Sequence, residues 1–394
     1  MMSGEKNGIN RICIISGGYP SEKRAINTFV DQLVCEFADM GMDCTVISPQ
    51  SATNIVLRRS ERLPYFRERV TLKGSIIKVY TPQFVSASTY RKGWINTAPV
   101  TLRSFTAAAS RVFRKLHGEM RFDAVYGHFI FPSGMTANHI GEECSVPSFL
   151  AYGENTNYTI EWLGTEKTRS YLGQIKGVVS VSTANAENLI RQGIVKKEII
   201  GIFPNSVNGG LFYRRDKGEM RRKYGLPPNA FIIAFVGRFV DIKGANRLSA
   251  AIGKIGGDKV KSIFIGSGDY GPSCEGILLK GPQPHWNIPE LLSASDVFVL
   301  PTLAEGCCNA IIEAMACGLP VISSDRDFND DILDETCSIR IDPTNIDDIT
   351  SAIELLLNCS GLRSKLGEGA LKKAKQLDIE TRARNIINFM ESKI

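Results

Sequence analysis

The sequence of 394 residues predicts an α/β protein made of two doubly wound, Rossmann-like domains. Two observations indicate this fold class: short apolar runs alternate with longer helical patterns, and the alternation starts again after Pro204. The composition agrees, with 43% hydrophobic and 22% charged residues. It excludes a disordered chain, a fibrous repeat and a protein with many membrane spans.

The first series of elements predicts an N-terminal domain over residues 1–205. Arg11–Ser16 has the pattern of a buried strand, Thr28–Gly41 that of an amphipathic helix, and Cys44–Ser48 that of the next strand. Such a strand–helix–strand unit implies a parallel sheet with right-handed crossovers. Further strands are expected at Ile76–Tyr80, Ala124–Gly127, Ser148–Ala151 and Val178–Val181.

The second series predicts a C-terminal domain over residues 206–378, followed by a helix at 379–394 that packs back toward the first domain. The connection through Pro204, Asn205, Gly209 and Gly210 is short and typical of a hinge. Strands are expected at Phe231–Val236, Ser262–Gly266, Ile277–Lys280, Val297–Leu300 and Val321–Ser323. Helices are expected at Ala245–Lys254, Ile288–Ser295 and Ala310–Cys317.

The net charge of +6 is unevenly distributed along the chain. Residues 1–205 hold 24 basic and 17 acidic residues, whereas residues 206–394 hold 23 and 24. Residues 55–121 alone hold 14 basic and 3 acidic residues, a net charge of +11. We expect this segment to attract phosphates, nucleic acid or an anionic membrane, unless it is a solvated face. Within it, residues 102–117 have the pattern of a basic amphipathic helix that lies on lipid.

Ten cysteines are scattered without a CxxC pair or a zinc-like spacing, so we expect a reducing compartment and no disulfide framework. The first residues, MMSGEKNGIN, lack the apolar segment of a signal peptide, and no apolar run is long enough to span a bilayer. These features predict a cytoplasmic protein with at most peripheral contact with the inner face of the membrane.

Glycines and cations follow the first predicted strand of each domain. Gly17 and Gly18 permit close backbone approach to a phosphate, although a plain tight turn explains them equally well. Arg238 ends the first strand of the second domain, and Lys243 lies in the same loop. Arginine offers a planar fork and lysine a point charge, so the pair is suited to clamp a diphosphate. The alternative is two solvated cations at a helix start.

The segment after Val297–Leu300 holds two glutamates around a helix start. Glu305 precedes this helix, and Glu313 lies inside it, about 12 Å further along the helix axis. This is the separation of a sugar from the ribose across a diphosphate, so we expect Glu313 to bind ribose hydroxyls and Glu305 those of a transferred sugar. The alternative is that Glu305 only interacts with the helix dipole and that Glu313 is a surface residue, although Glu313 has apolar neighbours. Backbone N–H groups are expected to face an anion at Gly306, Cys307, Cys308 and Asn309.

Two further features carry less chemical information. His128 comes just past a predicted strand, and a lone histidine is more often structural than catalytic. Asp325-Arg326-Asp327 is similar to the DxD of metal-dependent transferases, but a match of three residues arises by chance, and this one follows a late strand. We therefore expect no metal site.

Taken together, the motifs resemble the retaining glycosyltransferases of family 4 (glycosyl transferases group 1), which have the GT-B fold of two Rossmann-like domains facing across a cleft. The resemblance covers nearly the whole chain. It rests on PNSVN with Leu211-Phe212 at 204–212, VGRF with Lys243-Gly244 at 236–244, Gly266-Ser267-Gly268, and the E-x7-E of Glu305 and Glu313 followed by EAMACGLPV. Tyr19-Pro20 with FVDQ at 29–32 resembles the subgroup that acts on cell-surface polysaccharides.

The resemblance implies a role for each of these residues. Arg238 and Lys243 would neutralise the donor diphosphate, so that no metal or other cofactor is required, and Glu313 would hold the ribose. His128 matches the family's histidine that faces the sugar. The implied donor site is Gly17, Gly18, Arg238, Lys243, Gly266, Glu305, Gly306, Cys307, Cys308, Asn309 and Glu313. The implied catalytic residues are Glu305, His128, Arg238 and Lys243.

The chain also departs from the family pattern in three places. The HG-x-D segment appears as Tyr152-Gly153-Glu154-Asn155, and GG-x-P-E is replaced by Phe328-Asn329-Asp330-Asp331. Cys307 and Cys308 stand where an aromatic residue and a proline are common.

The resemblance implies a hexosyltransferase that uses a UDP- or GDP-sugar. Its acceptor would be a glycan or a polyprenyl-diphosphate-linked sugar at an anionic membrane, which suits the charge of residues 55–121. Two alternatives remain open: a non-catalytic, membrane-associated scaffold that kept the fold, and a nucleotide-sugar epimerase. Nucleic acid is disfavoured as a partner, because no binding module accompanies the basic segment.

Overall fold

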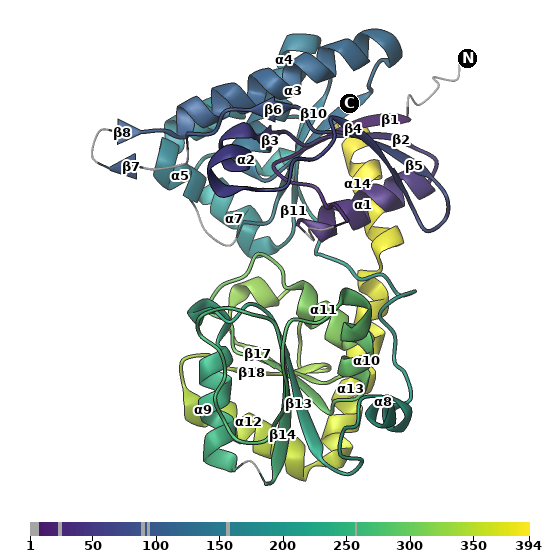
Figure 1. Cartoon of the computed structure of the whole chain (residues 1–394), viewed down its shortest axis with the longest axis vertical. Helices are drawn as coiled ribbons and strands as arrows, with labels where there is room; N and C mark the ends of the chain where they lie inside the picture. The colour runs from purple at the N-terminus through teal and green to yellow at the C-terminus, as the bar shows by residue number, and fades with distance from the viewer. Residues whose placement is uncertain (1–7, 23–25, 88–90, 93–94, 155–157, 257) are drawn as a thin grey trace. The chain divides into compact units, whose positions relative to one another are not determined.

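The computed structural model describes residues 8–22, 26–87, 91–92, 95–154, 158–256 and 258–394. The chain divides into two compact units: unit 1 comprises Met1–Phe203 and Ala383–Ile394, and unit 2 comprises Pro204–Arg382 (Figure 1). The domain boundaries expected from the sequence lie at 205/206 and 378/379. Each unit is an α/β body with its own sheet, as the sequence predicts.

Unit 1 is built on an eight-stranded sheet with the strand order β12-β11-β10-β9-β1-β2-β5-β4. Only β4 runs antiparallel to its neighbour, which is β5. The strands are β1 (Arg11–Ser16), β2 (Asp43–Ile47), β4 (Phe66–Val70), β5 (Ile76–Tyr80), β9 (Ala124–His128), β10 (Ser148–Tyr152), β11 (Gly177–Ser180) and β12 (Ile200–Ile202). Two small sheets pair β3 (Gln50–Ser51) with β6 (Gln83–Phe84) and β7 (Arg91–Lys92) with β8 (Ile95–Asn96).

Helices cover both faces of this sheet (Figure 1). Side chains of β1 alternate between the two faces, so Ile12 and Ile14 join one hydrophobic core and Cys13 and Ile15 join the other. The first core is closed by α1 (Thr28–Asp39) and α14 (Ile379–Glu391), the second by α3 (Ala98–Met120) and α4 (Met135–Cys144). The remaining helices are α2 (Ala52–Arg58), α5 (Tyr158–Leu163), α6 (Thr165–Tyr171) and α7 (Thr183–Arg191).

The basic helix expected to lie on lipid is α3, and its apolar face is used differently. Phe105, Val112, Phe113 and Leu116 are buried against the sheet, so this face is part of the protein core and is not available to a membrane. Only the opposite, basic face of α3 reaches solvent. Within the described part of the chain, no helix is both long and apolar enough to cross a membrane.

Unit 2 contains a six-stranded sheet, wholly parallel, with the order β15-β14-β13-β16-β17-β18. The strands are β13 (Phe231–Val236), β14 (Val260–Ile265), β15 (Ile277–Gly281), β16 (Val297–Leu300), β17 (Val321–Ser324) and β18 (Ser338–Ile341). The helices are α8 (Lys217–Lys223), α9 (Ala245–Ile255), α10 (Ile288–Ser293), α11 (Asn309–Ala316), α12 (Ile346–Asn358) and α13 (Ser360–Ala374). The central strands are buried apolar runs, as expected for a parallel sheet with helices on both faces.

Each sheet has one point at which the strand order reverses. In unit 1 the point lies between β1 and β9, and in unit 2 it lies between β13 and β16. Ligands of open α/β sheets bind outside the carboxyl ends of the strands at such points. Gly17, Gly18 and His128 stand at the first point, and Arg238 and Glu305 stand beside the second.

Candidate active site

Two loops meet at the switch point of unit 2. The backbone N–H of Leu303 donates to the carbonyl oxygen of Ile242 at 2.7 Å, and Thr302 Oγ1 donates to the same oxygen at 3.1 Å. Gly244 has a φ of 79°, and a side chain there would collide with the backbone of Pro301. Glycine is therefore required for the loop after β13 to approach the loop after β16.

This contact between loops brings Lys243 and Glu305 together. The Lys243 ammonium donates to Glu305 Oε1, which also accepts from Thr302 Oγ1 at 3.1 Å. The side chains are only 16% and 8% exposed, so the ion pair is largely shielded from water. Burial disfavours the charged form of Lys243, the charge and hydrogen bond of Glu305 favour it, and the net shift of the Lys243 pKa is upward. The Lys243 ammonium is thus charged at neutral pH.

Arg238 lies beside this pair and differs from it in exposure. It lies two residues after the end of β13, its side chain is exposed, and its charge acts on Lys243. Among the described residues, its guanidinium has no hydrogen-bond or ion-pair partner, although its backbone carbonyl accepts from Val240 at 2.9 Å. The switch point therefore offers one unpaired guanidinium next to an ammonium that a carboxylate holds.

Glu313 lies inside α11 in surroundings that disfavour its charge. Its side chain is 16% exposed, and burial raises its pKa to about 7. Its Oε1 is 4.0 Å from His285 Nε2, and the His285 and Phe212 rings form a T-shaped pair with centroids 5.4 Å apart. Burial lowers the pKa of His285, so at neutral pH Glu313 faces an uncharged imidazole. His285 was not among the residues predicted from the sequence, although its place shortly after the carboxyl end of β15 is a signal that could have indicated it.

The segment before α11 is held by Asn205, which contacts Cys307. Asn205 Nδ2 donates to the carbonyl oxygen of Cys307 at 3.0 Å, and the Asn205 N–H lies 3.3 Å from Cys307 Sγ. Burial raises the pKa of Cys307 to about 12 and that of Cys308 further, so both thiols stay protonated. Neither is a thiolate nucleophile. The N-cap of α11 is Cys308 rather than an oxygen-bearing residue.

Gly266 has a structural explanation in unit 2. Its φ is 149°, and a Cβ atom there would overlap the carbonyl oxygen of Gly237. Gly268 has a φ of 145° and approaches the backbone of Phe239 in the same way. These glycines let the loop after β14 pack against the loop that carries Arg238, so they shape the site through backbone packing.

The predicted residues of unit 1 gather at its own switch point. A Cβ atom built on Gly17 would lie 3.7 Å from Pro132 and from Ser133, which follow β9. His128 ends β9 opposite Ser16 of β1, is only 4% exposed, and packs on the Tyr126 ring with centroids 4.7 Å apart. The loops after β1 and β9 are therefore in contact.

Glu154, known from the sequence only as a departure from the family pattern, is part of this second group. Its Oε1 accepts the backbone N–H of Ile130 at 2.8 Å, and its carbonyl oxygen accepts from Asn185 Nδ2 at 3.0 Å. Burial raises its pKa to about 7. Glu154 thus fixes the loop that follows His128. Asn155, the next residue of this motif, lies outside the described residues.

Replacing Glu154 with glutamine is expected to stabilise the protein at pH 8. Folding raises the pKa of this acid from about 4.5, so its contribution is most favourable below pH 4.5 and is lost as the pH rises through 7. Glutamine keeps the acceptor for Ile130 and removes a charge whose burial costs up to about 3 kcal/mol. Thermal unfolding at pH 4.5 and pH 8 measures the effect. The gain should be confined to pH 8 and absent in the exposed control Glu166→Gln; an equal gain at both pH values would refute it.

The DxD-like segment has a structural use. Arg340 Nη2 lies 3.3 Å from Asp325 Oδ1 and 2.9 Å from Asp330 Oδ1. Within the described ranges, no group of three or more His, Cys, Asp or Glu side chains is arranged to hold a metal ion.

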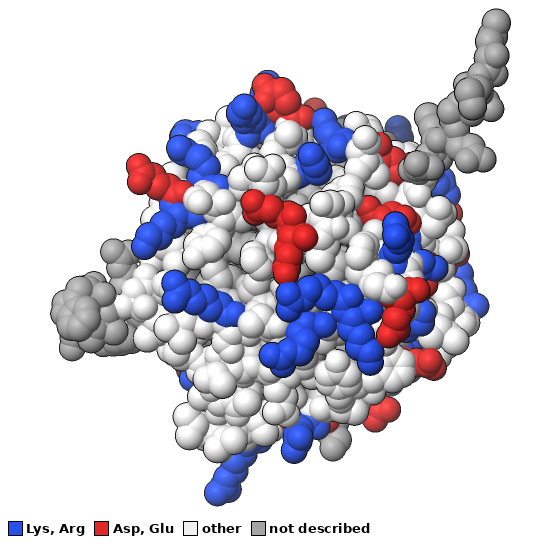
Figure 2. Space-filling model, turned by 90° about the horizontal axis from the view of Figure 1, so that it is seen from above, with Lys and Arg blue, Asp and Glu red and all other residues white. Residues whose placement is uncertain are grey.

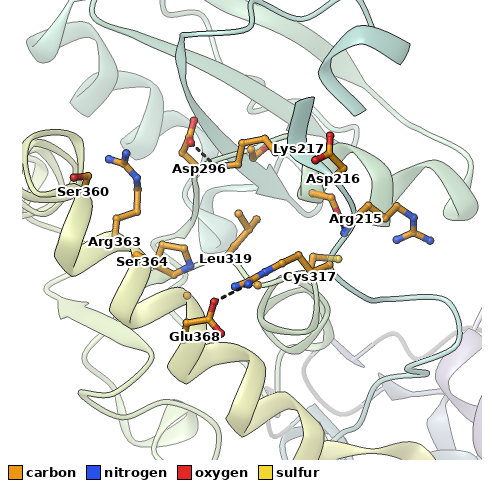
Figure 3. A pocket seen from close by; sticks show the side chains of 16 residues that line it. Arg215, Asp216, Lys217, Asp296, Cys317, Leu319, Ser360, Arg363, Ser364 and Glu368 are labelled. Atoms are coloured by element: carbon orange, nitrogen blue, oxygen red, sulfur yellow. Dashed lines mark hydrogen bonds and ion pairs between the residues drawn. The ribbon is translucent and has the colours of Figure 1, made fainter. Parts of the chain in front are cut away.

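A separate hollow of 610 Å³ lies at the other end of the unit 2 strands from Arg238 and Glu305 (Figure 3). Asp296 and Pro320 line it, and they directly precede β16 and β17, so it opens at the amino ends of the strands. Its charged groups largely satisfy one another: Lys217 Nζ is 2.7 Å from Asp296, and Glu368 is 2.6 Å from Arg214. None of the predicted donor-site residues lines this hollow.

The paired Rossmann-like sheets, with cations and carboxylates at the switch point of unit 2, define the class: the fold is GT-B, that of glycosyltransferases. Residues 216–373 match the family model described as glycosyl transferases group 1. A Bacillus subtilis protein named as a teichuronic acid biosynthesis glycosyltransferase, TuaC, is 29% identical over 326 residues, covering 80% of this chain and 81% of that protein. These matches support the glycosyltransferase superfamily for this chain.

Two further similarities extend this picture. The N,N'-diacetylbacillosaminyl-diphospho-undecaprenol alpha-1,3-N-acetylgalactosaminyltransferase of Campylobacter jejuni is 28% identical over 213 residues, covering 51% of this chain and 56% of that protein. The solved structure of sucrose-phosphate synthase from Thermosynechococcus elongatus has a TM-score of 0.75 at 19% identity, covering 96% of this chain and 97% of that chain. The latter likeness concerns the fold alone.

Proposed function

We propose that the protein transfers a sugar from a UDP- or GDP-sugar to a glycan or a polyprenyl-diphosphate-linked acceptor in cell-surface polysaccharide biosynthesis. The transfer retains the anomeric configuration and needs no metal ion. The observation that carries the proposal is the buried pair of Lys243 and Glu305 beside the unpaired Arg238 at the switch point of unit 2.

The diphosphate of the donor binds between Arg238 and Lys243. The guanidinium of Arg238 has no partner to give up, and the Lys243 ammonium can donate to phosphate oxygens as well as to Glu305. When phosphate oxygens accept hydrogen bonds from Lys243, the ammonium is shared between the phosphate and Glu305. The Glu305 carboxylate can then accept hydrogen bonds from hydroxyl groups of the sugar. Both cations stabilise the charge that develops on the departing nucleotide, which is the role a metal plays in other transferases.

Glu313 binds the ribose of the donor through its hydroxyl groups. The position deep in α11 supports this role, since a carboxylate with a pKa near 7 gains more from two hydroxyl donors than a solvated one does. His285 stands 4.0 Å away as a neutral ring, and Phe212 supports it. The proposed ribose site therefore has one pair of polar groups, Glu313 and His285, with apolar side chains around them.

Unit 1 supplies the acceptor side of the reaction. His128 is placed at the end of β9 and held in register with Ser16, where we assign it the role of facing the transferred sugar. The relatives named for teichuronic acid biosynthesis and for an undecaprenol-linked substrate support a polysaccharide or lipid-linked acceptor. A lipid-linked acceptor places the protein at the cytoplasmic face of a membrane, as a peripheral protein.

Nucleotide sugars are expected to raise the melting temperature of the full chain. A ligand at a hundred times its dissociation constant stabilises the folded state by about 2.7 kcal/mol, which for a unit of this size is a shift of about 5 °C. UDP-, GDP- and ADP-sugars should be compared in the presence of a metal chelator. A shift with one base and not the others identifies the donor. No shift with any of them would contradict the proposal and favour the scaffold.

A further inference from the structure

A hollow of 450 Å³ on the helical face of unit 1 has no part in the proposed chemistry. It lies between α3, α4 and the end of α6, and none of the predicted donor or catalytic residues lines it. Its floor is apolar, formed by Leu102 and Met135, which are 3% and 1% exposed, with the exposed Ala107 on its wall. The hollow is partly open to solvent. The helices α3 and α4 pack against the sheet with their other faces.

One polar group inside this hollow is without a partner. Ser110 lines the hollow, is only 3% exposed, and its Oγ forms no hydrogen bond to any described residue. Its neighbour Thr106 is satisfied, because its hydroxyl pairs with Thr136 at 2.8 Å. A buried hydroxyl without a partner is unfavourable, so Ser110 has a hydrogen bond available to donate into the hollow.

The rim of the hollow carries surplus positive charge. Arg114 is paired with Glu143 at 2.7 Å, and His139 also faces Glu143 at 3.7 Å. Arg103 lines the rim and is exposed, and within the described ranges it has no ion-pair partner. The same holds for Arg111 and Lys115, further along the exposed face of α3. Seen from above, the face over which α3 and α4 run carries many basic side chains, with acidic ones interspersed (Figure 2).

We propose that this hollow binds one anionic phospholipid of a membrane surface. The phosphate contacts Arg103 and Arg114, an ester carbonyl accepts from Ser110, and the upper part of an acyl chain covers Leu102 and Met135. The inference deepens the proposed function and rests on it in one respect: a lipid-linked acceptor requires the enzyme at a membrane. It also gives α3 a different role from the one predicted, because the lipid enters beside the helix and the helix's own apolar face stays in the core.

Vesicle flotation of the full chain tests the lipid site. Wild type should bind phosphatidylcholine vesicles only when they contain phosphatidylglycerol. Arg103→Glu should lower the partition coefficient about tenfold, whereas the matched reversal Lys176→Glu, on an exposed residue outside the hollow, should change it little. Equal losses in the two variants, or no binding by wild type, would overturn the site.

A second pair of variants separates the hollow from the charge around it. Ala107→Gln places a long, uncharged polar side chain on the wall of the hollow, where it obstructs an acyl chain, and Ala107→Ser adds a single oxygen atom there. Only the glutamine variant should lose vesicle binding, and binding retained by both would show that surface charge alone acts. Nucleotide-sugar binding, measured on the same samples, should be the same in all variants. If wild type bound no nucleotide sugar, this would count against the proposed function but would leave the conclusion on the lipid site unchanged.

Discussion

Glu313→Gln is expected to lower the affinity for the nucleotide sugar about 10- to 100-fold. A hydrogen bond to a charged group contributes about 1.5–3 kcal/mol, and the amide loses the charge while keeping the shape. The folded protein should become more stable at pH 8 at the same time, because burial raises the pKa of Glu313 to about 7 and the amide carries no charge to bury. Affinity and stability are thus expected to move in opposite directions, which mere misfolding cannot produce.

Calorimetry across pH 6.5 to 8.5 provides the measurement. Hydroxyl donors favour the ionised carboxylate, so in wild type affinity should rise as the pH passes about 7, with release of a proton on binding. Glu313→Gln should show neither effect. Glu354→Gln, on the exposed side of α12, serves as the control and should behave as wild type. A wild-type affinity independent of pH, together with full affinity in the variant, would remove Glu313 from the ribose site.

Arg238→Ala combined with Lys243→Ala is expected to abolish detectable donor binding. Each cation contributes a charge-assisted contact to the diphosphate, so each single change should weaken binding about 10- to 100-fold. Arg238→Ala is the cleaner variant, because this side chain is exposed and its removal leaves no group unpaired. Lys243→Ala leaves the buried Glu305 without its ion-pair partner and should also lower the melting temperature.

Titration with the nucleotide sugar and with the corresponding nucleoside locates the loss. Both variants should bind the nucleoside, which has no phosphate, as well as wild type does. Lys254→Ala removes an exposed lysine of α9 that pairs with Asp347, and it should leave donor binding unchanged. Full donor affinity in the double variant, or equal losses for sugar nucleotide and nucleoside, would contradict a diphosphate clamp.

The main strands could be predicted from the sequence because burial on both faces leaves an unbroken apolar run. β1, β13 and β16 begin and end at the predicted residues. So does β5, although Lys78 interrupts its apolar run and Ile76 is exposed. The edge strand β4 was not predicted, since it is mostly exposed and carries charged side chains. The helix α3 extends beyond the predicted residues 102–117 at both ends. Its apolar periodicity was visible in the sequence, but the surface that the apolar face contacts is a sheet assembled from distant segments, which the sequence pattern does not reveal.

The site was predictable where it depends on a loop after a strand and not where it depends on contacts between loops. Arg238, Lys243 and Glu305 each follow a strand that the sequence reveals. The ion pair that holds two of them together joins residues 62 positions apart, and spacing along the chain carries no information on it. His285 beside Glu313 and the Ile130 amide on Glu154 were missed for the same reason.

The return of α14 to the first sheet determines the order in which the protein can be completed during synthesis. Ala383, Ile386, Ile387 and Met390 are buried in the same core as β1, yet they follow the whole of unit 2 in the chain. A ribosome-bound chain in which all of unit 2 has been synthesised still lacks the part of α14 that completes the core of unit 1. The nascent first unit therefore remains open to chaperones and proteases until its last helix emerges. Residues 1–203 expressed alone would carry this defect permanently.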